Sequence, residues 1–384
     1  MQPEIRKDKR EQLISQLKLN FPKPKLHFSG STPPELFVGR VNYPNVFSGI
    51  LSPTYKGDTS IMSSPDEWVE KNMPIDEVLT YRGQMIYGRK LTNIKLPKSF
   101  HNITQELALS SKPVSMEFFL KKAPVPDFTE SKMLSIMAKP APIEKVILEE
   151  NPRVDKKVDY IVGDYDVRAT DALQELYNSN IKTSHLQKLF SVGMLGVKTD
   201  RKLVPTRWSI TAVDDILSKE LLKKIKTYSE INEISVFHDE YNGNHYEIIL
   251  LPGEFKFEVI EIETTEEGRW QDYEDFFGRK KYADSVTGAY YANRLAVCEY
   301  LEKIKKQANV VIFRQISEDY YAPLGVGILR ELMRRAVKNG PIKFSSIGET
   351  LGDIKSRLII PVEKYSESSW ILKNYGKQKK LFDF

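Results

Sequence analysis

The uneven distribution of proline most constrains what this chain can fold into. Of its 21 prolines, 16 lie before residue 153, and six of these fall within residues 113–152. Each proline removes a backbone donor and interrupts helices and central strands. We therefore expect the first 150 residues to form short strands joined by long, anchored loops, with residues 113–152 as a connector or strap. Residues 4–19, where Leu13 and Leu17 lie among basic side chains, predict an N-terminal helix.

Regular apolar periodicity begins only after residue 165. It predicts three helices in the middle of the chain, at residues 169–178, 183–190 and 212–228. Thr211 and Asp214 form a capping-box pattern that would start the last of them, so Arg207 and Trp208 should precede it.

A group of strands follows the helix at 212–228. Three apolar segments, separated by Asn242-Gly243 and Pro252-Gly253 turns, predict a β-meander, with strands at residues 234–240, 246–251 and 255–262. Two helices then flank a further strand, at residues 290–307, 310–315 and 325–338. The fold class is therefore α+β: a proline-rich N-terminal region, a central helix with a meander, a mixed helix/strand C-terminal region, and a flexible tail from Ser366.

The cysteine count and the hydropathy exclude several classes of protein. With Cys298 alone, neither an intrachain disulfide nor a cysteine-rich zinc module can form, and its mid-helix position predicts a buried core residue. No apolar run approaches the roughly 18 residues of a membrane helix, and the N-terminus has no secretory pattern. We expect a cytoplasmic, nucleoid-associated protein without a membrane partner.

Positive charge is concentrated toward the C-terminus. Residues 279–384 contain 20 Lys or Arg and 11 Asp or Glu, a balance of +9, so the remainder carries 5 − 9 = −4. Such asymmetry permits DNA binding, because neutralising phosphates releases counterions. It also fits ordinary solvated helix faces, so charge alone does not decide between these interpretations.

The last seven residues have a spacing typical of a docking peptide. Gln378 is followed three residues later by Leu381 and six residues later by Phe384, with Phe382 between them. In a single 3₁₀ turn of about three residues, Leu381 and Phe384 would project from one side into a hydrophobic pocket. This QxxLxxF pattern is that of peptides that bind the DNA sliding clamp (PCNA). The clamp is therefore the predicted partner.

Four sequence blocks resemble the archaeal Nre family of DNA-repair proteins, of the NreA type. They are residues 37–46 (FVGRVNYPNV), 204–215 (VPTRWSITAVDD), 291–301 (YANRLAVCEYL) and 314–326 (RQISEDYYAPLGV). The resemblance implies a role in repairing DNA damage, the sliding clamp as partner, and an N-terminal and a C-terminal Nre region. The expected boundaries are 1–26 for a helical extension, 27–278 and 279–365 for the Nre regions, and 366–384 for the tail. Many relatives have a cysteine zinc motif that this chain lacks, so no cysteine-ligated zinc is implied.

Two of these blocks carry residue types that suit DNA or nucleotide binding. Arg207 and Trp208 offer a phosphate ligand and a stacking surface before a helix N-terminus. Arg40, Tyr43 and Asn45 offer the same kinds of group on a proline-bounded loop. We hypothesise that the two segments share one pocket; the alternative is that Trp208 is core and Arg207 ion-paired. The other two blocks contribute the candidate DNA contacts Arg294 and Arg314.

A competing hypothesis is a metal-dependent nuclease or nucleotide-processing enzyme tethered to the clamp. Such a site needs carboxylates that converge on a divalent cation, and the candidates are Asp214, Asp215, Glu258 and Glu261. A second candidate metal site lies on the 234–251 hairpin. If Asn242-Gly243 is a two-residue turn, one face presents His238, Glu240, His245 and Glu247, although such a face is more often simply solvated. A third possibility is a non-enzymatic adaptor that brings other repair enzymes to the clamp.

Overall fold

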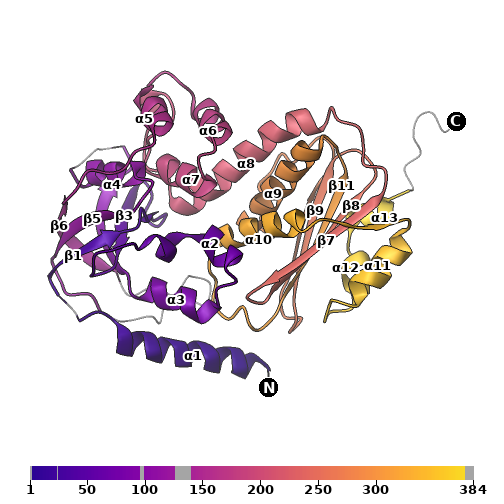
Figure 1. Ribbon diagram of the computed structural model, residues 1–384, viewed down its shortest axis with the longest axis horizontal. Coiled ribbons are helices and arrows are strands. Elements are labelled where there is room, and N and C mark those ends of the chain that lie inside the picture. The colour runs from indigo at the N-terminus through magenta and orange to yellow at the C-terminus, as the bar shows by residue number, and fades with distance from the viewer. Residues whose placement is uncertain (1, 24, 96–98, 126–139, 377–384) are drawn as a thin grey trace. The chain divides into compact units, whose positions relative to one another are not determined.

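The computed structural model describes residues 2–23, 25–95, 99–125 and 140–376, and the chain divides into two compact units (Figure 1). The N-terminal unit comprises Asp8–Leu217 with Ala322–Gly325. The C-terminal unit comprises Ser218–Tyr321 and Val326–Phe384, with Met1–Lys7 assigned to it. Each unit is built on its own six-stranded sheet, which confirms the α+β class. Among the described residues, no helix combines the length and apolarity that crossing a membrane requires.

The sheet of the N-terminal unit has the order β1-β5-β6-β4-β3-β2. Its strands are β1 (His27–Thr32), β2 (Leu36–Val38), β3 (Asn45–Ser52), β4 (Ile86–Asn93), β5 (Val114–Leu120) and β6 (Ala141–Leu148). All neighbours pair antiparallel except β4 and β6, which are parallel. The prediction that residues 113–152 form a connector or strap is wrong for the described part of this segment, which supplies strands β5 and β6 of the sheet. Along β5, buried residues alternate with half-buried ones.

Helices were underestimated in this proline-rich region. The structure contains α1 (Gln2–Asn20), η1 (Ser60–Ser63), α2 (Pro65–Glu70), α3 (Ile75–Gly83) and α4 (Ser99–Leu109). Prolines begin two of these helices, because Pro65 is the first residue of α2 and Pro74 precedes α3. A proline at that position loses no helical hydrogen bond, and its fixed φ suits the first turn. The remaining helices of the unit are α5 (Lys156–Gly163), α6 (Ala169–Asn178), α7 (Thr183–Ser191), η2 (Lys198–Asp200) and the start of α8 (Thr206–Ile225).

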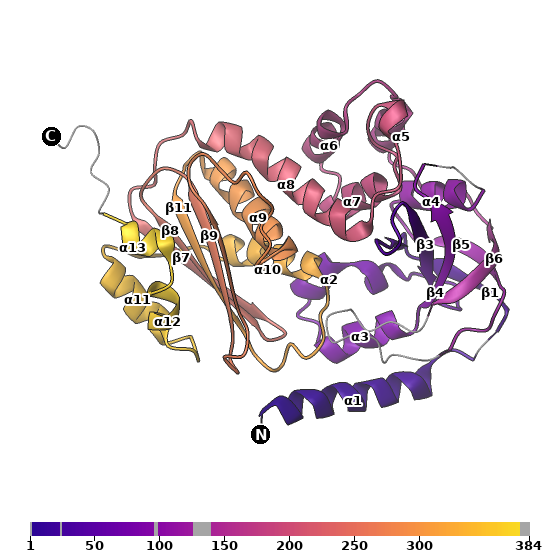
Figure 2. The same ribbon diagram turned by 180° about the vertical axis from the view of Figure 1, so that it is seen from behind.

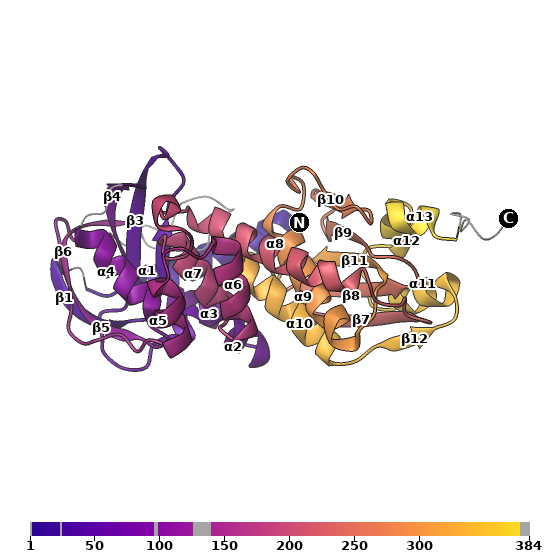
Figure 3. The same cartoon turned by 90° about the horizontal axis from the view of Figure 1, so that it is seen from above.

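The sheet of the C-terminal unit has the order β10-β9-β11-β8-β7-β12, which Figure 3 shows along its edge. Its strands are β7 (Ile234–Tyr241), β8 (Asn244–Leu251), β9 (Lys256–Glu263), β10 (Arg269–Glu274), β11 (Asn309–Ile316) and β12 (Ile342–Phe344). The strands of the predicted meander form, but β8 and β9 do not pair. Instead β11 lies between them, antiparallel to β8 and parallel to β9. All eight residues of β11 are buried, so the strand needs a central position with both faces covered.

Helices cover both faces of this sheet (Figure 2). On one face lie α9 (Gly288–Ile304) and α10 (Val326–Lys338), and on the other α11 (Ile347–Lys355), α12 (Val362–Ser366) and α13 (Trp370–Asn374). A flexible tail was predicted from Ser366, but the described residues up to Gly376 are folded. Ile371 of α13 is 2% exposed and packs in the hydrophobic core between the sheet and α11, α12 and α13. Cys298 is fully buried in α9, as predicted.

Candidate nucleic-acid interface

Two exposed aromatic side chains meet on the surface of the N-terminal unit. Tyr43 precedes β3 and Trp208 lies in the first turn of α8, and each is 45% exposed. Their ring centroids are 5.4 Å apart, with the planes tilted by 50°. The two segments that we hypothesised to share a pocket are therefore adjacent, although 165 residues of chain separate them.

Backbone hydrogen bonds position both segments. The amide of Val38 donates to Thr206 Oγ1 over 2.8 Å, which ties the end of β2 to the first residue of α8. Gly39 N donates to the carbonyl of Phe47 and Asn45 N to that of Asn42, each over 2.8 Å, so the loop between β2 and β3 closes on itself. Asn42 has a φ of +63°, which Asn tolerates better than most residues.

Each of the two segments also carries an exposed arginine. Arg40 and Arg207 are exposed, and within the described part of the chain neither guanidinium has a hydrogen-bond or ion-pair partner. We give the name Tyr43–Trp208 surface to five of the exposed residues of the two segments: Arg40, Val41, Tyr43, Arg207 and Trp208. Unpaired guanidiniums beside exposed rings can bind phosphates while nucleobases stack on the rings.

The start of α8 differs from the prediction. The helix begins at Thr206, so Arg207 and Trp208 lie in its first turn rather than ahead of it. Thr211 does not cap the helix; its hydroxyl donates to the carbonyl of Arg207 one turn earlier, over 3.3 Å. The capping-box pattern was misleading because Pro205, which accepts the amides of Trp208 and Ser209, already marks the true start.

The strand beside this loop supplies a contact that the sequence analysis missed. Arg89 of β4 places its guanidinium 4.0 Å from the centroid of the Phe47 ring. Asn93 donates to Asn45 Oδ1 over 2.8 Å, so the predicted site residue Asn45 is held by its cross-strand neighbour. Leu91, also on β4, is 50% exposed. No strand was predicted over residues 89–93, and these residues do not alternate between apolar and polar types, so no sequence pattern indicated this contact.

Two other predicted DNA contacts are buried and must be corrected. Arg294 is 2% exposed and forms a 2.8 Å ion pair with Glu274, while Arg314 is 5% exposed and forms a 2.8 Å ion pair with Glu261. Burial lowers the pKa of Arg314, but the charge of Glu261 outweighs this and raises it. Both arginines neutralise carboxylates inside the C-terminal unit, so neither side chain reaches a phosphate in this structure.

The candidate catalytic carboxylates do not converge on a metal site. Asp214 is fully buried and accepts a hydrogen bond from Gln187 Nε2 over 3.0 Å. Asp215 is half-buried beside it in α8. Glu258 and Glu261 are three residues apart on one strand and therefore point to opposite faces of the sheet. Among the described residues, no group of three or more His, Cys, Asp or Glu side chains is arranged to hold a metal ion.

Glu258 instead binds the N-terminus of α13. Its carboxylate accepts hydrogen bonds from the hydroxyl of Ser369 over 2.5 Å, and from the amides of Trp370 and Ile371 over 2.8 and 3.1 Å. Gln271 Nε2 donates a fourth, over 2.7 Å. A carboxylate at a helix start is favoured by the free amides there, which explains how Glu258 is buried without a cation.

The hairpin candidate is an ion-pair cluster rather than an open metal site. The two-residue turn forms as predicted, and His238 faces Glu247 while Glu240 faces His245. His245 contacts Glu247 over 2.7 Å and Glu240 over 3.5 Å. Arg357 closes the cluster with hydrogen bonds of 2.8 and 3.0 Å to the two oxygens of Glu247.

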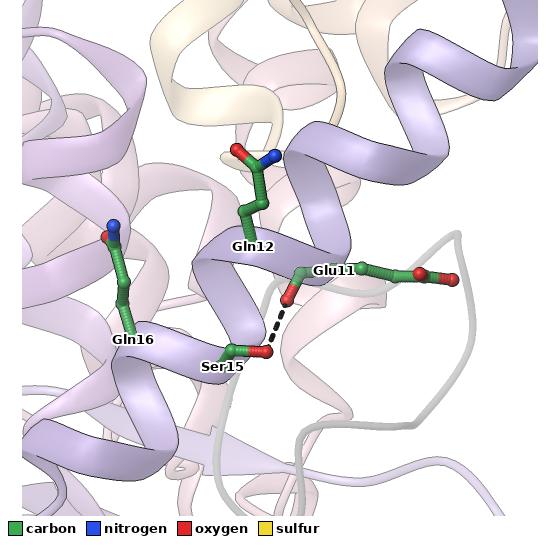
Figure 4. A pocket seen from close by; sticks show the side chains of 4 residues that line it. All are labelled: Glu11, Gln12, Ser15 and Gln16. Carbon is green, nitrogen blue, oxygen red and sulfur yellow. Dashed lines mark hydrogen bonds between the residues drawn. The ribbon is translucent and has the colours of Figure 1, made fainter.

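A surface hollow lies along α1 (Figure 4). Its volume is about 530 Å³, and its described lining residues are Glu11, Gln12, Ser15 and Gln16. All four belong to one helix, and Ser15 donates to the carbonyl of Glu11, so the hollow gathers no convergent set of chemical groups.

Comparison with known proteins assigns the chain to a family. The family model described as archaeal Nre, N-terminal, matches residues 11–270, and that described as archaeal Nre, C-terminal, matches residues 274–384. This chain belongs to the archaeal Nre family. No solved structure matches this Nre protein.

Curated relatives of this Nre protein align over most of their length. The protein named DNA repair protein NreB from Archaeoglobus fulgidus is 36% identical over 92% of this chain and 91% of its own. DNA repair protein NreA from the same organism is 37% identical over 83% of this chain and 82% of its own. DNA repair protein NreA from Haloferax volcanii is 32% identical over 92% and 88%.

The boundary between the two Nre matches differs from the boundary between the compact units. The matches divide inside β10, whereas the units divide inside α8, between Leu217 and Ser218. The expected region boundaries at residues 26, 278 and 365 remain predictions. The candidate clamp residues Gln378, Leu381, Phe382 and Phe384 lie outside the described residues, which end at Gly376.

Glu258→Ala tests whether this carboxylate is structural. Four donors lose their acceptor, so we expect the free energy of unfolding to fall by about 3 kcal/mol. Urea denaturation measures this, and the exposed Glu254→Ala is the matched control, with a change within about 0.5 kcal/mol. Unchanged stability combined with loss of a metal-dependent activity would instead restore the nuclease hypothesis.

His245 gives the C-terminal unit a defined pH dependence. Burial lowers its pKa, but hydrogen bonding and attraction from Glu247 and Glu240 outweigh burial and raise the pKa above 6.5. The ion pairs of protonated His245 therefore stabilise the folded state fully below pH 6.5, and this stabilisation is lost as pH rises through the folded-state pKa. We expect His245→Gln to remove this loss in urea denaturation series between about pH 6 and pH 9. Parallel curves for the two proteins above pH 6.5 would contradict the assignment.

Proposed function

We propose that this Nre protein is a DNA-repair factor that docks on the sliding clamp and binds single-stranded DNA with the Tyr43–Trp208 surface. The observation that carries the DNA-binding part is the 5.4 Å ring pair beside two arginines without partners in the described chain. The three relatives are all named DNA repair proteins, which supports the cellular role. A cytoplasmic, nucleoid-associated location is part of the same proposal.

Single-stranded DNA is favoured over intact duplex by the chemistry of the surface. Exposed rings need unstacked bases as partners, and in a duplex both faces of each base are already stacked. Arg40 and Arg207 come from the same two segments as the rings, so they can hold the phosphates that flank a stacked base. A nucleotide would use the same groups, but it offers only one base to two rings.

The C-terminal peptide supplies the second contact. Gln378, Leu381 and Phe384 have the clamp-binding spacing, and the peptide follows closely after α13, which is packed on the sheet. The DNA surface would then be held near DNA at a high effective concentration, which strengthens binding without any new contact in the body.

The structure also bears on the two alternative functions, a nuclease and a non-enzymatic adaptor. A nuclease would need other carboxylates, since Asp214, Glu258 and Glu261 each have structural partners. A non-enzymatic adaptor for other repair enzymes is compatible with clamp docking. It differs from our proposal because it requires no affinity of the purified protein for DNA.

Truncation after Lys377 tests the clamp contact. We expect calorimetry to show binding of the full chain to the sliding clamp of the source organism and none for the truncated chain, because Gln378, Leu381 and Phe384 are removed. Phe384→Ala should weaken the affinity through loss of one buried ring. Equal binding by the full and truncated chains, or binding by neither, would contradict the clamp proposal.

Trp208→Ala and Arg207→Ala test the DNA contact. Fluorescence anisotropy with a labelled single-stranded oligonucleotide should show a loss of about 1–3 kcal/mol in binding free energy for Trp208→Ala, the value of one stacked base. For Arg207→Ala, the slope of log affinity against log salt should fall by about 0.7, the value of one phosphate contact.

The controls are Tyr160→Ala and Arg168→Ala, an exposed aromatic residue and an exposed arginine of the same unit. Neither should change the affinity. Melting temperatures should stay close to that of the unaltered protein, because none of the four side chains is buried. A large loss of stability in Trp208→Ala with DNA affinity intact would mean that the surface is structural.

A further inference from the structure

A second aromatic feature lies on the C-terminal unit, in the loop that joins β10 to α9. We call residues 275–284 the Phe277 loop. Phe277 is 90% exposed, more than any other large hydrophobic side chain among the described residues. An exposed ring of this size costs free energy in water.

One guanidinium ties the two ends of the loop together. Arg279 donates hydrogen bonds to the carbonyls of Tyr273, before the loop, and Tyr282, within it, over 2.8 and 3.1 Å. The same side chain forms a 2.9 Å ion pair with Asp272 on β10. Arg279 is thus committed to the loop backbone and is not available for a ligand.

Further hydrogen bonds fix the base and the tip. The second oxygen of Asp272 accepts the amides of Ser285 and Val286 over 3.1 and 2.7 Å. At the tip, Asp275 accepts the amide of Phe277 over 2.9 Å, and Gly278 adopts a φ of +80°. The backbone conformation is therefore determined by named interactions, and the exposure of Phe277 is a property of that conformation.

Lysines lie on the loop and beside its other phenylalanine. Lys280 and Lys281 are exposed on the loop, and Lys226 Nζ lies 5.0 Å from the ring centroid of Phe276, which packs edge-on against Phe277 at 5.8 Å. The two exposed lysines of the loop equal its two exposed carboxylates, Asp275 and Asp284, in number, and Lys226 adds a third cation from outside the loop. Tyr282 adds a second ring, 49% exposed.

We propose that the Phe277 loop is a wedge that inserts the Phe277 ring between bases where a DNA duplex opens, with Lys280 and Lys281 on the adjoining phosphates. This inference rests on the DNA-binding part of the proposed function and adds a different site and a different DNA structure. Apolar wedges of this kind unstack a base step, and the energetic cost is lowest where pairing is already broken. A rigid loop suits the role, because a flexible one would bury its ring on the protein surface.

The test uses the full chain and a forked duplex with 2-aminopurine at the junction, whose fluorescence rises when the base unstacks. We expect the unaltered protein to raise the fluorescence and Phe277→Ala to lose the rise, with about tenfold weaker binding to the fork. Phe277→Trp should retain both. Ile359→Ala, which shortens another exposed apolar side chain of the unit, should behave like the unaltered protein.

The outcomes separate this inference from the proposed function. Retention of the fluorescence rise in Phe277→Ala overturns the wedge. Loss of the rise in Phe277→Ala, but not in Trp208→Ala, supports the wedge as a site distinct from the Tyr43–Trp208 surface. If the unaltered protein binds neither single strands nor forks, the proposed function fails as well. If Phe277→Ala changes only self-association in light scattering, the loop is a protein contact and the wedge is overturned.

Discussion

Four buried carboxylates in one sheet determine how the C-terminal unit can fold. Glu247, Glu258, Glu261 and Glu274 lie on β8, β9 and β10 and are at most 5% exposed. A buried carboxylate without a partner is strongly destabilising. Each of these four interacts with a group from later in the chain: Arg357, the N-terminus of α13, Arg314 and Arg294. The sheet is therefore favourable only when those later segments are in place.

This dependence explains why the two Nre regions share one unit. Glu247, Glu258 and Glu261 fall in the region matched by the N-terminal model, whereas Arg357, the N-terminus of α13 and Arg314 fall in the region matched by the C-terminal one. The central strand β11 inserts between β8 and β9 and joins the two regions by hydrogen bonds on both edges. Both regions thus contribute strands to the sheet of the C-terminal unit, and separating them near residue 270 would remove the partners of buried charges.

The sequence predicted local elements well and their partners poorly, for a physical reason. Periodicity reports which faces are buried, so α6, β7 and β11 were predicted close to their observed bounds. It does not report which strand lies next to which, so the insertion of β11 was missed. Arg294 and Arg314 were assigned to DNA because an arginine in a sequence does not show its own burial. The meeting of Tyr43 and Trp208 was hypothesised from residue chemistry, yet only the fold places them 5.4 Å apart.

Because several arginines are engaged within the fold, only some of the arginines of the chain can contact DNA. Arg279, Arg294, Arg314 and Arg357 neutralise carboxylates or bind backbone carbonyls, so replacing them would disturb the fold before it disturbed recognition. The guanidiniums of Arg40 and Arg207 form no ion pair or hydrogen bond with other described residues. Each arginine lies on the same segment as an exposed ring, and hydrogen bonds fix the backbone of both segments. Fixed exposed rings lose little conformational entropy when a base stacks on them. That pre-organisation is what distinguishes the Tyr43–Trp208 surface and the Phe277 loop from the many solvated lysines of the chain.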